Sequence, residues 1–434
     1  MINCFFHFQK KFLIYVLYKK LYCIYLIILY QTNMNKIYYG KAVYDNKEIK
    51  AVNNVLRNNS LNLIDGPHVK KLEKKVAHMF GKKYGLMVNS GSSANLLALR
   101  SFRFKKGSEI ITPSLTFATT VAPIYQIGLI PHFIGAVENK FLADPDQIER
   151  AINNKTVALI IPNLLGNIAD WKKINKIAKK YNLKIIEDSA DTIGYTINKK
   201  NSGNLSDVTT NSFYASHIIN GAGSGGIACF NDHKLYEHAK LLRGWGRSSA
   251  TFNESEKIED RFNVKISGIQ YDKKYIFSEL GYNFLPSEIS AAFALEQIKK
   301  LKKNIELRER NFKYLKDYFS RYSKYFKLPE TYPGVKTPWL AFPLVIKENK
   351  KFNRKQLQIF YEKNNIQTRT IFTGNILRQP IMRNLKYKSH KNSGKVANDV
   401  MKNGILLGCH QGLNFNDLRT ISSKFDKFAK IKKL

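Results

Sequence analysis

The feature that most restricts the fold is an alternation of short apolar segments with amphipathic segments between residues 84 and 188. The apolar segments predict strands and the amphipathic ones predict helices. Strands that alternate with helices of this length form a parallel sheet covered by helices on both faces, which is an α/β fold. The expected strands are Tyr84–Asn89, Glu109–Pro113, Val157–Pro162 and Lys184–Asp188, and the expected helices are Ser92–Phe102, Thr119–Ile127 and Trp171–Tyr181.

The segments on either side of this core predict two parts of unequal size. Helices are expected at Asp45–Arg57, with a capping box, and at Pro67–Phe80. Residues 230–275 are polar and predict irregular structure, residues 281–302 predict helix, and a long charged helix starts near residue 304. We therefore expect a large domain at 34–303 and a small α+β domain at 304–434. The small domain is expected to contain strands Trp339–Ile346 and Gln367–Thr370, helix Arg354–Asn364 and a last helix from Asn416.

Residues 1–33 differ from the rest because they are apolar and aromatic, with four lysines and no acidic residue. The longest uninterrupted apolar run, Leu21–Tyr30, is too short to span a bilayer. An uncleaved anchor, a membrane-surface helix and an extension absent from the native protein all remain open. The ordinary globular composition after Met34 favours the third interpretation. We expect a cytoplasmic protein, with peripheral membrane association through residues 1–33 as the alternative.

The chain is strongly basic. It contains 71 Lys and Arg residues and 33 Asp and Glu residues, which give a net charge of +38. An anionic substrate such as a sugar nucleotide suits this charge. The excess is mostly lysine, is spread evenly and comes without a nucleic-acid-binding motif, so no nucleic-acid partner is expected. The four cysteines have neither metal-ligand spacing nor the density of a disulfide framework, so no metal site is expected.

The segment Asn89–Asn95, NSGSSAN, joins an expected strand to an expected helix. Small residues let an anion approach the backbone, and the N–H groups at a helix start favour phosphate. Gly91 and Ser92 are therefore candidates for phosphate binding. The segment also fits an ordinary capped turn, and this motif alone does not separate the two.

Two further segments have candidate residues for a ring-shaped ligand. Asp188 and Asp191, in EDSAD, follow an apolar strand. Asp188 could pair with a cationic ring nitrogen, hold magnesium or cap a helix. Phe117, between a strand and a helix, could stack on a planar ring, although an aromatic residue there usually belongs to the core.

The segment Asn211–Gly226, NSFYASHIINGAGSGG, contains the residue that decides the chemistry. It predicts a short strand, Asn211–Ala215, followed by a glycine-rich turn. His217 is a catalytic base in the functional interpretation and a hydrogen-bonded loop histidine in the structural one.

Together, NSGSSANLLAL, TPSLTFATT, EDSAD, NSFYASH and LGYNFLPSEISAAFALEQ resemble the DegT/DnrJ/EryC1/StrS family of pyridoxal-phosphate-dependent sugar aminotransferases. The similarity covers the chain from about Tyr38 to its end and implies the fold-type-I architecture. It also implies a homodimer whose sites lie across the subunit interface. The implied cofactor contacts are phosphate binding by Gly91, Ser92 and Ser212, ring stacking by Phe117, pairing of the ring nitrogen with Asp188, a further site position at Asp191, and phosphate binding by Asn283 from the other subunit.

One departure changes the expected reaction. The family's aminotransferases have a lysine four residues after the phenylalanine of the SF pair, and this chain has His217 there. An imidazole cannot form the stable covalent link that a lysine amine forms with pyridoxal, but it moves protons near neutral pH. A histidine-bearing branch of the family has the same change. It consists of 3-dehydratases of nucleotide-linked 4-keto-6-deoxyhexoses, which use pyridoxamine phosphate. RGWGR at 243–247 and RTIFTGNILRQP at 369–380 also resemble this branch.

The branch's best-known members hold an iron–sulfur cluster through four cysteines, three of them just after GWGR. This chain has SSATFNESEK there, so no such cluster is expected. The resemblance implies a dehydratase of deoxysugar and lipopolysaccharide O-antigen biosynthesis, with a separate reductase as a possible partner. The alternatives are a nucleotide-sugar aminotransferase and a non-catalytic or membrane-tethered relative.

Overall fold

The protein is described from a computed structural model that covers residues 19, 36–58, 63–200, 203–252 and 257–434. Apart from Lys19, residues 1–33 lie outside the described part, so the interpretations of that segment stay predictions. Within the described ranges, no helix is long and apolar enough to cross a membrane.

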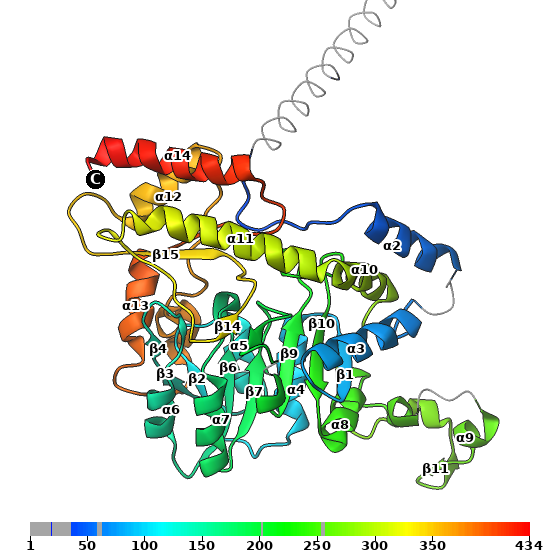
Figure 1. Cartoon of the computed structure of the whole chain (residues 1–434). Helices are drawn as coiled ribbons and strands as arrows, with labels where there is room; N and C mark the ends of the chain where they lie inside the picture. The colour runs from blue at the N-terminus through cyan, green and yellow to red at the C-terminus, as the bar shows by residue number, and fades with distance from the viewer. Residues whose placement is uncertain (1–18, 20–35, 59–62, 201–202, 253–256) are drawn as a thin grey trace, which may run out of the picture.

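The centre of the molecule is a mostly parallel sheet, which in the described part of the chain has eight strands (Figure 1). The strands from β9 to β16 in the sheet order pair in parallel, and β10 runs antiparallel to both of its neighbours. The predicted α/β class is confirmed. In sheet order the strands are β1 (Tyr84–Val88), β10 (Gly226–Phe230), β9 (Val208–Ser212), β7 (Lys184–Asp188), β6 (Thr156–Pro162), β2 (Glu109–Pro113), β3 (Ile130–Ile134) and β16 (Lys388–Ser389).

Helices cover both faces of this sheet because alternate strand residues enter two separate cores. Ala158 and Ile160 of β6 belong to one core, and Leu159 and Ile161 belong to the other. The first core is covered by α4 (Gly91–Ser101), α5 (Ala118–Gln126) and α8 (His233–Arg243). The second is covered by α3 (Pro67–Met79), α6 (Pro145–Ala151), α7 (Trp171–Lys180) and α10 (Glu288–Lys299), and α2 (Asn46–Asn58) packs on α10.

Several elements differ from the expectation. The strand expected at Asn211–Ala215 is β9, which starts at Val208 and ends at Ser212, because Val208 pairs with Ile186 of β7. The region 230–275, expected to be irregular, contains the helix α8. Residues 367–370 form only an isolated bridge between Arg369 and Leu406 instead of a strand.

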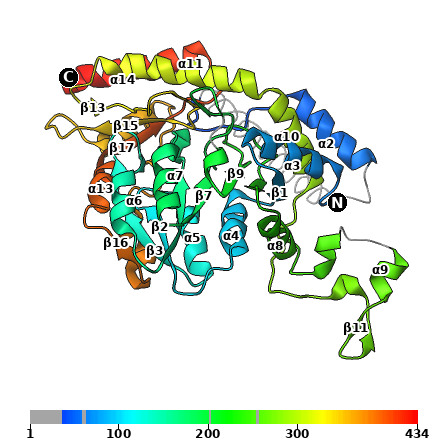
Figure 2. The ribbon, with the colours of Figure 1, turned by 60° about the horizontal axis from the view of Figure 1, so that its bottom comes forward.

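The C-terminal part builds its own core around an antiparallel sheet. This sheet contains β13 (Phe326–Lys327), β15 (Phe342–Ile346) and β17 (Gly404–Leu407). It is accompanied by α11 (Leu301–Ser320), α12 (Arg354–Lys363), α13 (Gly394–Asn403) and α14 (Phe415–Lys432), of which α11 and α14 run side by side (Figures 1 and 2). Because β16 pairs with β3 of the large sheet, the two parts share a sheet. The boundary between residues 303 and 304 stays a prediction.

A segment between α8 and α10 extends from the body of the molecule (Figure 2). It includes α9 (Ile258–Phe262), β11 (Lys265–Ile266) and β12 (Ile269–Gln270). Large apolar side chains on it are open to solvent, among them Ile258 at 70% exposure and Leu280 at 85%. An apolar surface of this kind marks a contact site rather than a free face.

Phe425 of α14 is the centre of the aromatic packing in the C-terminal core. It is fully buried, with ring centroids 5.1 Å from Phe319 and 4.8 Å from Tyr322. We expect Phe425→Ala to lower the free energy of unfolding by about 3–5 kcal/mol, because it leaves a cavity. Phe415→Ala on the same helix, half exposed, is the control and costs under about 1 kcal/mol. Urea unfolding of both variants measures the difference, and equal losses would contradict the expectation.

Candidate functional site

A cavity of about 860 Å³ lies at the carboxyl ends of β7 and β9, next to the starts of α4 and α5. Ligands of open α/β sheets bind at this edge. Seven of the eight predicted site residues line it, namely Gly91, Ser92, Phe117, Asp188, Asp191, Ser212 and His217. Asn283 does not line it. Asn283 lies on the exposed stretch before α10, where it forms a bridge with Gly244.

The start of α4 forms an anion-binding corner of the cavity. Ser90 caps the helix by accepting a hydrogen bond from the N–H of Ser93 at 3.2 Å. Gly91 packs so closely on the end of β9 that a Cβ at this position would lie 2.6 Å from Cβ of Ser212. Only glycine allows this approach, which places the start of α4 beside Ser212.

Asp188 provides a buried carboxylate at the end of β7. Its Oδ2 accepts hydrogen bonds from Asn95 at 2.8 Å and Thr120 at 2.7 Å, and its Oδ1 accepts one from the N–H of Ala190 at 3.1 Å. Burial raises the pKa of Asp188, and these three donors oppose the rise. Glu187 points to the opposite face of the strand and binds Ser189 at 2.8 Å, so only Asp188 of this adjacent pair serves the cavity.

Phe117 presents an open ring at the start of α5. Its side chain is 49% exposed although it lines the cavity, and its ring meets Phe372 edge-on with centroids 5.6 Å apart. An aromatic residue between a strand and a helix is usually buried in the core, but Phe117 is not. The free ring face can take a planar ligand.

His217 sits between a backbone carbonyl and a carboxylate. Its Nδ1 lies 3.3 Å from the carbonyl oxygen of Ser212, and its Nε2 lies 4.0 Å from Oδ1 of Asp191. Burial lowers the pKa of His217 to about 4, and the Arg308 cation acts in the same direction. The imidazole is therefore neutral at pH 7, and Nδ1–H donates to the carbonyl and leaves Nε2 as an acceptor.

Asp191 is itself perturbed. Burial raises its pKa to about 7, and the N–H of Leu165 donates to its Oδ2 at 2.8 Å. Leu165 has a positive φ of 61°, a conformation that costs free energy and aims this N–H at Asp191. At pH 7 the imidazole of His217 is neutral and the carboxyl group of Asp191 is partly protonated, so the two side chains can exchange a proton.

Sequence reasoning missed several residues of the site. Asn95 and Thr120 lie inside the quoted motifs, and Asn95 could have been identified because it follows Gly91 by one helical turn in an otherwise apolar stretch. Tyr39, which precedes α2 in the chain, lines the cavity, and its neighbour Gly40 packs on Ser216. No local pattern identifies Tyr39, because tertiary packing brings it to the site.

Arg308 of α11 is another residue that the sequence did not single out. It is fully buried and binds Oε1 of Gln411 at 2.7 Å and the carbonyls of Trp339 and Leu340 at 3.1 Å each. Burial lowers its pKa to about 10. Leu340 lines the cavity, so Arg308 fixes part of the wall.

Two of the four cysteines lie in the described ranges. Cys229 and Cys409 are buried free thiols, and Cys4 and Cys23 lie outside the described ranges. No group of three or more His, Cys, Asp or Glu side chains in the described ranges could hold a metal ion.

The depressed pKa of His217 predicts a pH-dependent contribution to stability. The unfolded chain binds a proton at this histidine below about pH 6.5, whereas the folded protein does not until about pH 4. Stability is therefore lost as the pH falls. Relative to His217→Asn, the wild-type protein should lose about 2 kcal/mol from about pH 7.5 to about pH 5 in urea unfolding. Asp191 and His410 are present in both proteins, so their titrations cancel. A difference that does not change with pH would contradict the assignment.

Comparison with known proteins identifies the family. Residues 43–426 match the DegT/DnrJ/EryC1/StrS aminotransferase family. The lipopolysaccharide biosynthesis protein RfbH of Salmonella typhimurium is 34% identical over 369 residues, which cover 82% of this chain and 84% of that protein. The GDP-4-keto-6-deoxy-D-mannose 3-dehydratase of Yersinia pseudotuberculosis is 33% identical over 385 residues, which cover 86% of this chain and 93% of that protein.

A solved structure gives the same result. The Escherichia coli GDP-4-keto-6-deoxy-D-mannose-3-dehydratase with bound hydrated PLP superimposes with a TM-score of 0.80 at 31% identity. The alignment covers 89% of this chain and 98% of that one, and it confirms the fold-type-I architecture. The chain therefore belongs to the DegT/DnrJ/EryC1/StrS aminotransferase family.

Proposed function

We propose that the chain is a pyridoxamine-phosphate-dependent 3-dehydratase that acts on a nucleotide-linked 4-keto-6-deoxyhexose. One observation carries the proposal, namely that the described residues lining the cavity include His217 and no lysine. An enzyme that stores its cofactor on a lysine needs that amine in the cavity. A neutral histidine in its place suits proton transfer without covalent storage.

The residues of the cavity fit the cofactor. The corner of Gly91 and Ser212 suits its phosphate, the open face of Phe117 suits its ring, and Asp188 suits its protonated ring nitrogen. No described residue places a cation on Asp188, whose hydrogen bonds come from neutral donors. The protonated ring nitrogen of the cofactor would supply the positive charge that pairs with the carboxylate of Asp188. When bound, the cofactor supplies an amine that condenses with a ketone and a ring that takes up electrons.

The protein's own groups then manage the proton. His217 Nδ1–H is held by the Ser212 carbonyl, so Nε2 is the base that accepts a proton beside the bound ring. Asp191, with its raised pKa, lies 4.0 Å from Nε2 and can exchange a proton with it as the leaving hydroxyl departs. Asp188 would hold the proton on the ring nitrogen, and the protonated ring would stabilise the developing negative charge.

The names of the relatives support the proposed substrate class, and exposed residues of this chain support the proposed assembly. Relatives named for GDP-linked and dTDP-linked sugars leave the nucleotide open. Arg369 lines the cavity and is exposed, which suits a substrate diphosphate. Asn283 and the exposed apolar arm at 258–280 suit a homodimer in which Asn283 reaches the partner's cofactor phosphate. We place the enzyme in the cytoplasm, with a separate reductase as a possible partner in completing the deoxysugar.

Replacing the proposed base tests the reaction. His217→Asn should lower kcat at least about a hundredfold, because a positioned base contributes that much, while cofactor affinity changes little. The assay uses GDP-linked and dTDP-linked 4-keto-6-deoxyhexoses with glutamate present. Mass spectrometry monitors the rate at which the carbon-3 hydroxyl is lost, and this rate gives kcat. His233→Asn on the exposed face of α8 is the control. An amino sugar that retains its carbon-3 hydroxyl would show an aminotransferase instead, and failure to bind pyridoxamine phosphate would show a non-catalytic relative.

Borohydride treatment tests cofactor storage independently of the substrate. After reduction, wild-type protein given pyridoxal phosphate should hold no fixed cofactor on the segments that line the cavity, because the described lining residues include no lysine. The variant His217→Lys should become labelled at residue 217, since the new amine reaches the same cavity. Peptide mapping by mass spectrometry reads both results, because it separates a label in the cavity from labels on exposed lysines. A wild-type label on a residue of the cavity would overturn the role given to His217.

A further inference from the structure

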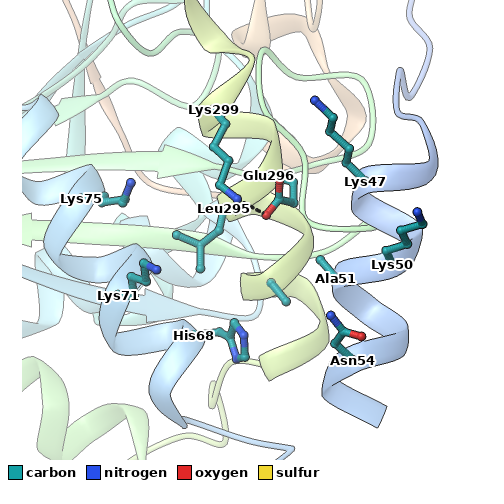
Figure 3. Close-up of a pocket in the computed structure, with 11 residues that line it drawn as sticks. Lys47, Lys50, Ala51, Asn54, His68, Lys71, Lys75, Leu295, Glu296 and Lys299 are labelled. Atoms are coloured by element: carbon teal, nitrogen blue, oxygen red, sulfur yellow. Dashed lines mark hydrogen bonds and ion pairs between the residues drawn. The ribbon is translucent and has the colours of Figure 1, made fainter. Parts of the chain in front are cut away.

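A second hollow lies between α2, α3 and α10, and it shares no lining residue with the large cavity. Its volume is about 390 Å³. Figure 3 shows α10 between the two other helices, with lysines of α2 on one wall and lysines of α3 on the other. We call this hollow the lysine groove, and it is lined by Lys47, Lys50, Lys71, Lys75, Lys299 and His68.

The carboxylates of α2 and α3 are engaged away from the groove. Glu48, the acid of α2, is fully buried, and its oxygens lie 2.6 and 2.7 Å from Nζ of Lys300. Glu73, the acid of α3, is buried and accepts the N–H of Met87 at 2.7 Å, and it also lies 3.2 Å from Arg243. Neither carboxylate lines the groove, so neither neutralises its lysines.

The carboxylates of α10 are engaged as well. Glu288 is fully buried and accepts the N–H groups of His68 and Val69 at 3.0 and 2.8 Å, and Nδ1 of His68 at 2.7 Å. This contact fixes the imidazole of His68 at the edge of the groove (Figure 3). Glu296, the acid that lines the groove, pairs with Lys299.

The remaining lysines form a concave site of uncompensated positive charge. Among the described residues, no carboxylate lies within ion-pair distance of Lys47, Lys50, Lys71 or Lys75. The two pairs are spaced three and four residues apart on their helices, an arrangement in which like charges repel. The acids of the same three helices do not neutralise these four lysines. Glu48, Glu73 and Glu288 are buried in other contacts, and Glu296 lines the groove but pairs with Lys299.

We propose that the lysine groove binds a small polyphosphate anion, such as pyrophosphate or the diphosphate of a nucleotide. The volume suits an anion of this size, and ammonium groups on two walls suit several phosphate oxygens at once. Among the described residues that line the groove there is no Phe, Tyr or Trp on which a base could stack, and we expect the phosphate charge to be recognised. This site is independent of the proposed dehydratase activity, because its residues are separate from those of the cavity.

Titration calorimetry with pyrophosphate tests the site on full-length protein saturated with pyridoxal phosphate. Lys71→Gln/Lys75→Gln should raise the Kd about tenfold, and Lys47→Gln/Lys50→Gln on the opposite wall should do the same. Lys70→Gln/Lys74→Gln makes the same charge change on α3 outside the groove and should alter the Kd by less than about twofold. GDP serves as a second probe. A tighter Kd for GDP that depends on the same lysines identifies a nucleotide as the source of the diphosphate.

Three results would overturn the proposal. Equal losses in the groove variants and in the Lys70/Lys74 control would show nonspecific charge attraction. Absence of pyrophosphate binding by the wild-type protein would remove the site. A groove that serves as a contact between two copies would appear in sedimentation as a changed assembly in Lys71→Gln/Lys75→Gln, with no pyrophosphate binding by the wild type.

Discussion

The buried carboxylate of Asp188 is the constraint on which the cavity depends. It joins three elements, because β7 supplies the acid, α4 supplies Asn95 and α5 supplies Thr120. Asn95 is fixed in turn by the hydroxyl of Thr210 on β9 at 2.6 Å. A carboxylate removed from water keeps its charge only when donors surround it. The same donors therefore set both the electrostatics of the site and the spacing of the helices that form its walls.

The protonation state of His217 is set by burial and by three neighbouring groups. Its environment provides one carbonyl acceptor and a carboxylic acid whose own pKa is raised, and the buried Arg308 disfavours a second positive charge. Histidine at this position is therefore a neutral base, as a proton-transfer role requires. Arg308 also holds the wall at Leu340, so a residue of α11 affects both the shape and the charge of the site.

Positive charge is handled differently in the two hollows of the molecule. Arg369 lines the same cavity as Asp188 and Asp191, and its guanidinium lies 5.8 Å from the ring of Tyr39. In the lysine groove Glu48, Glu73 and Glu288 are buried in helix contacts and Glu296 pairs with Lys299. The other four lysines therefore have no carboxylate partner among the described residues. The first arrangement suits a ligand with both polar and planar parts. The second suits an anion alone.

The sequence by itself determined the α/β class and the local motifs, because strand and helix periods and short turn signals are encoded within a few residues. Gly91, Phe117, Asp188 and His217 were found because each lies in such a motif. The end of β9 at Ser212 was missed because pairing with Gly226 of β10 sets it. The contacts of Asn95, Tyr39 and Arg308, and the engagement of every acid around the lysine groove, were decided by tertiary structure. These residues come from distant segments, and no sequence pattern measures which partner a buried charge finds when the chain packs.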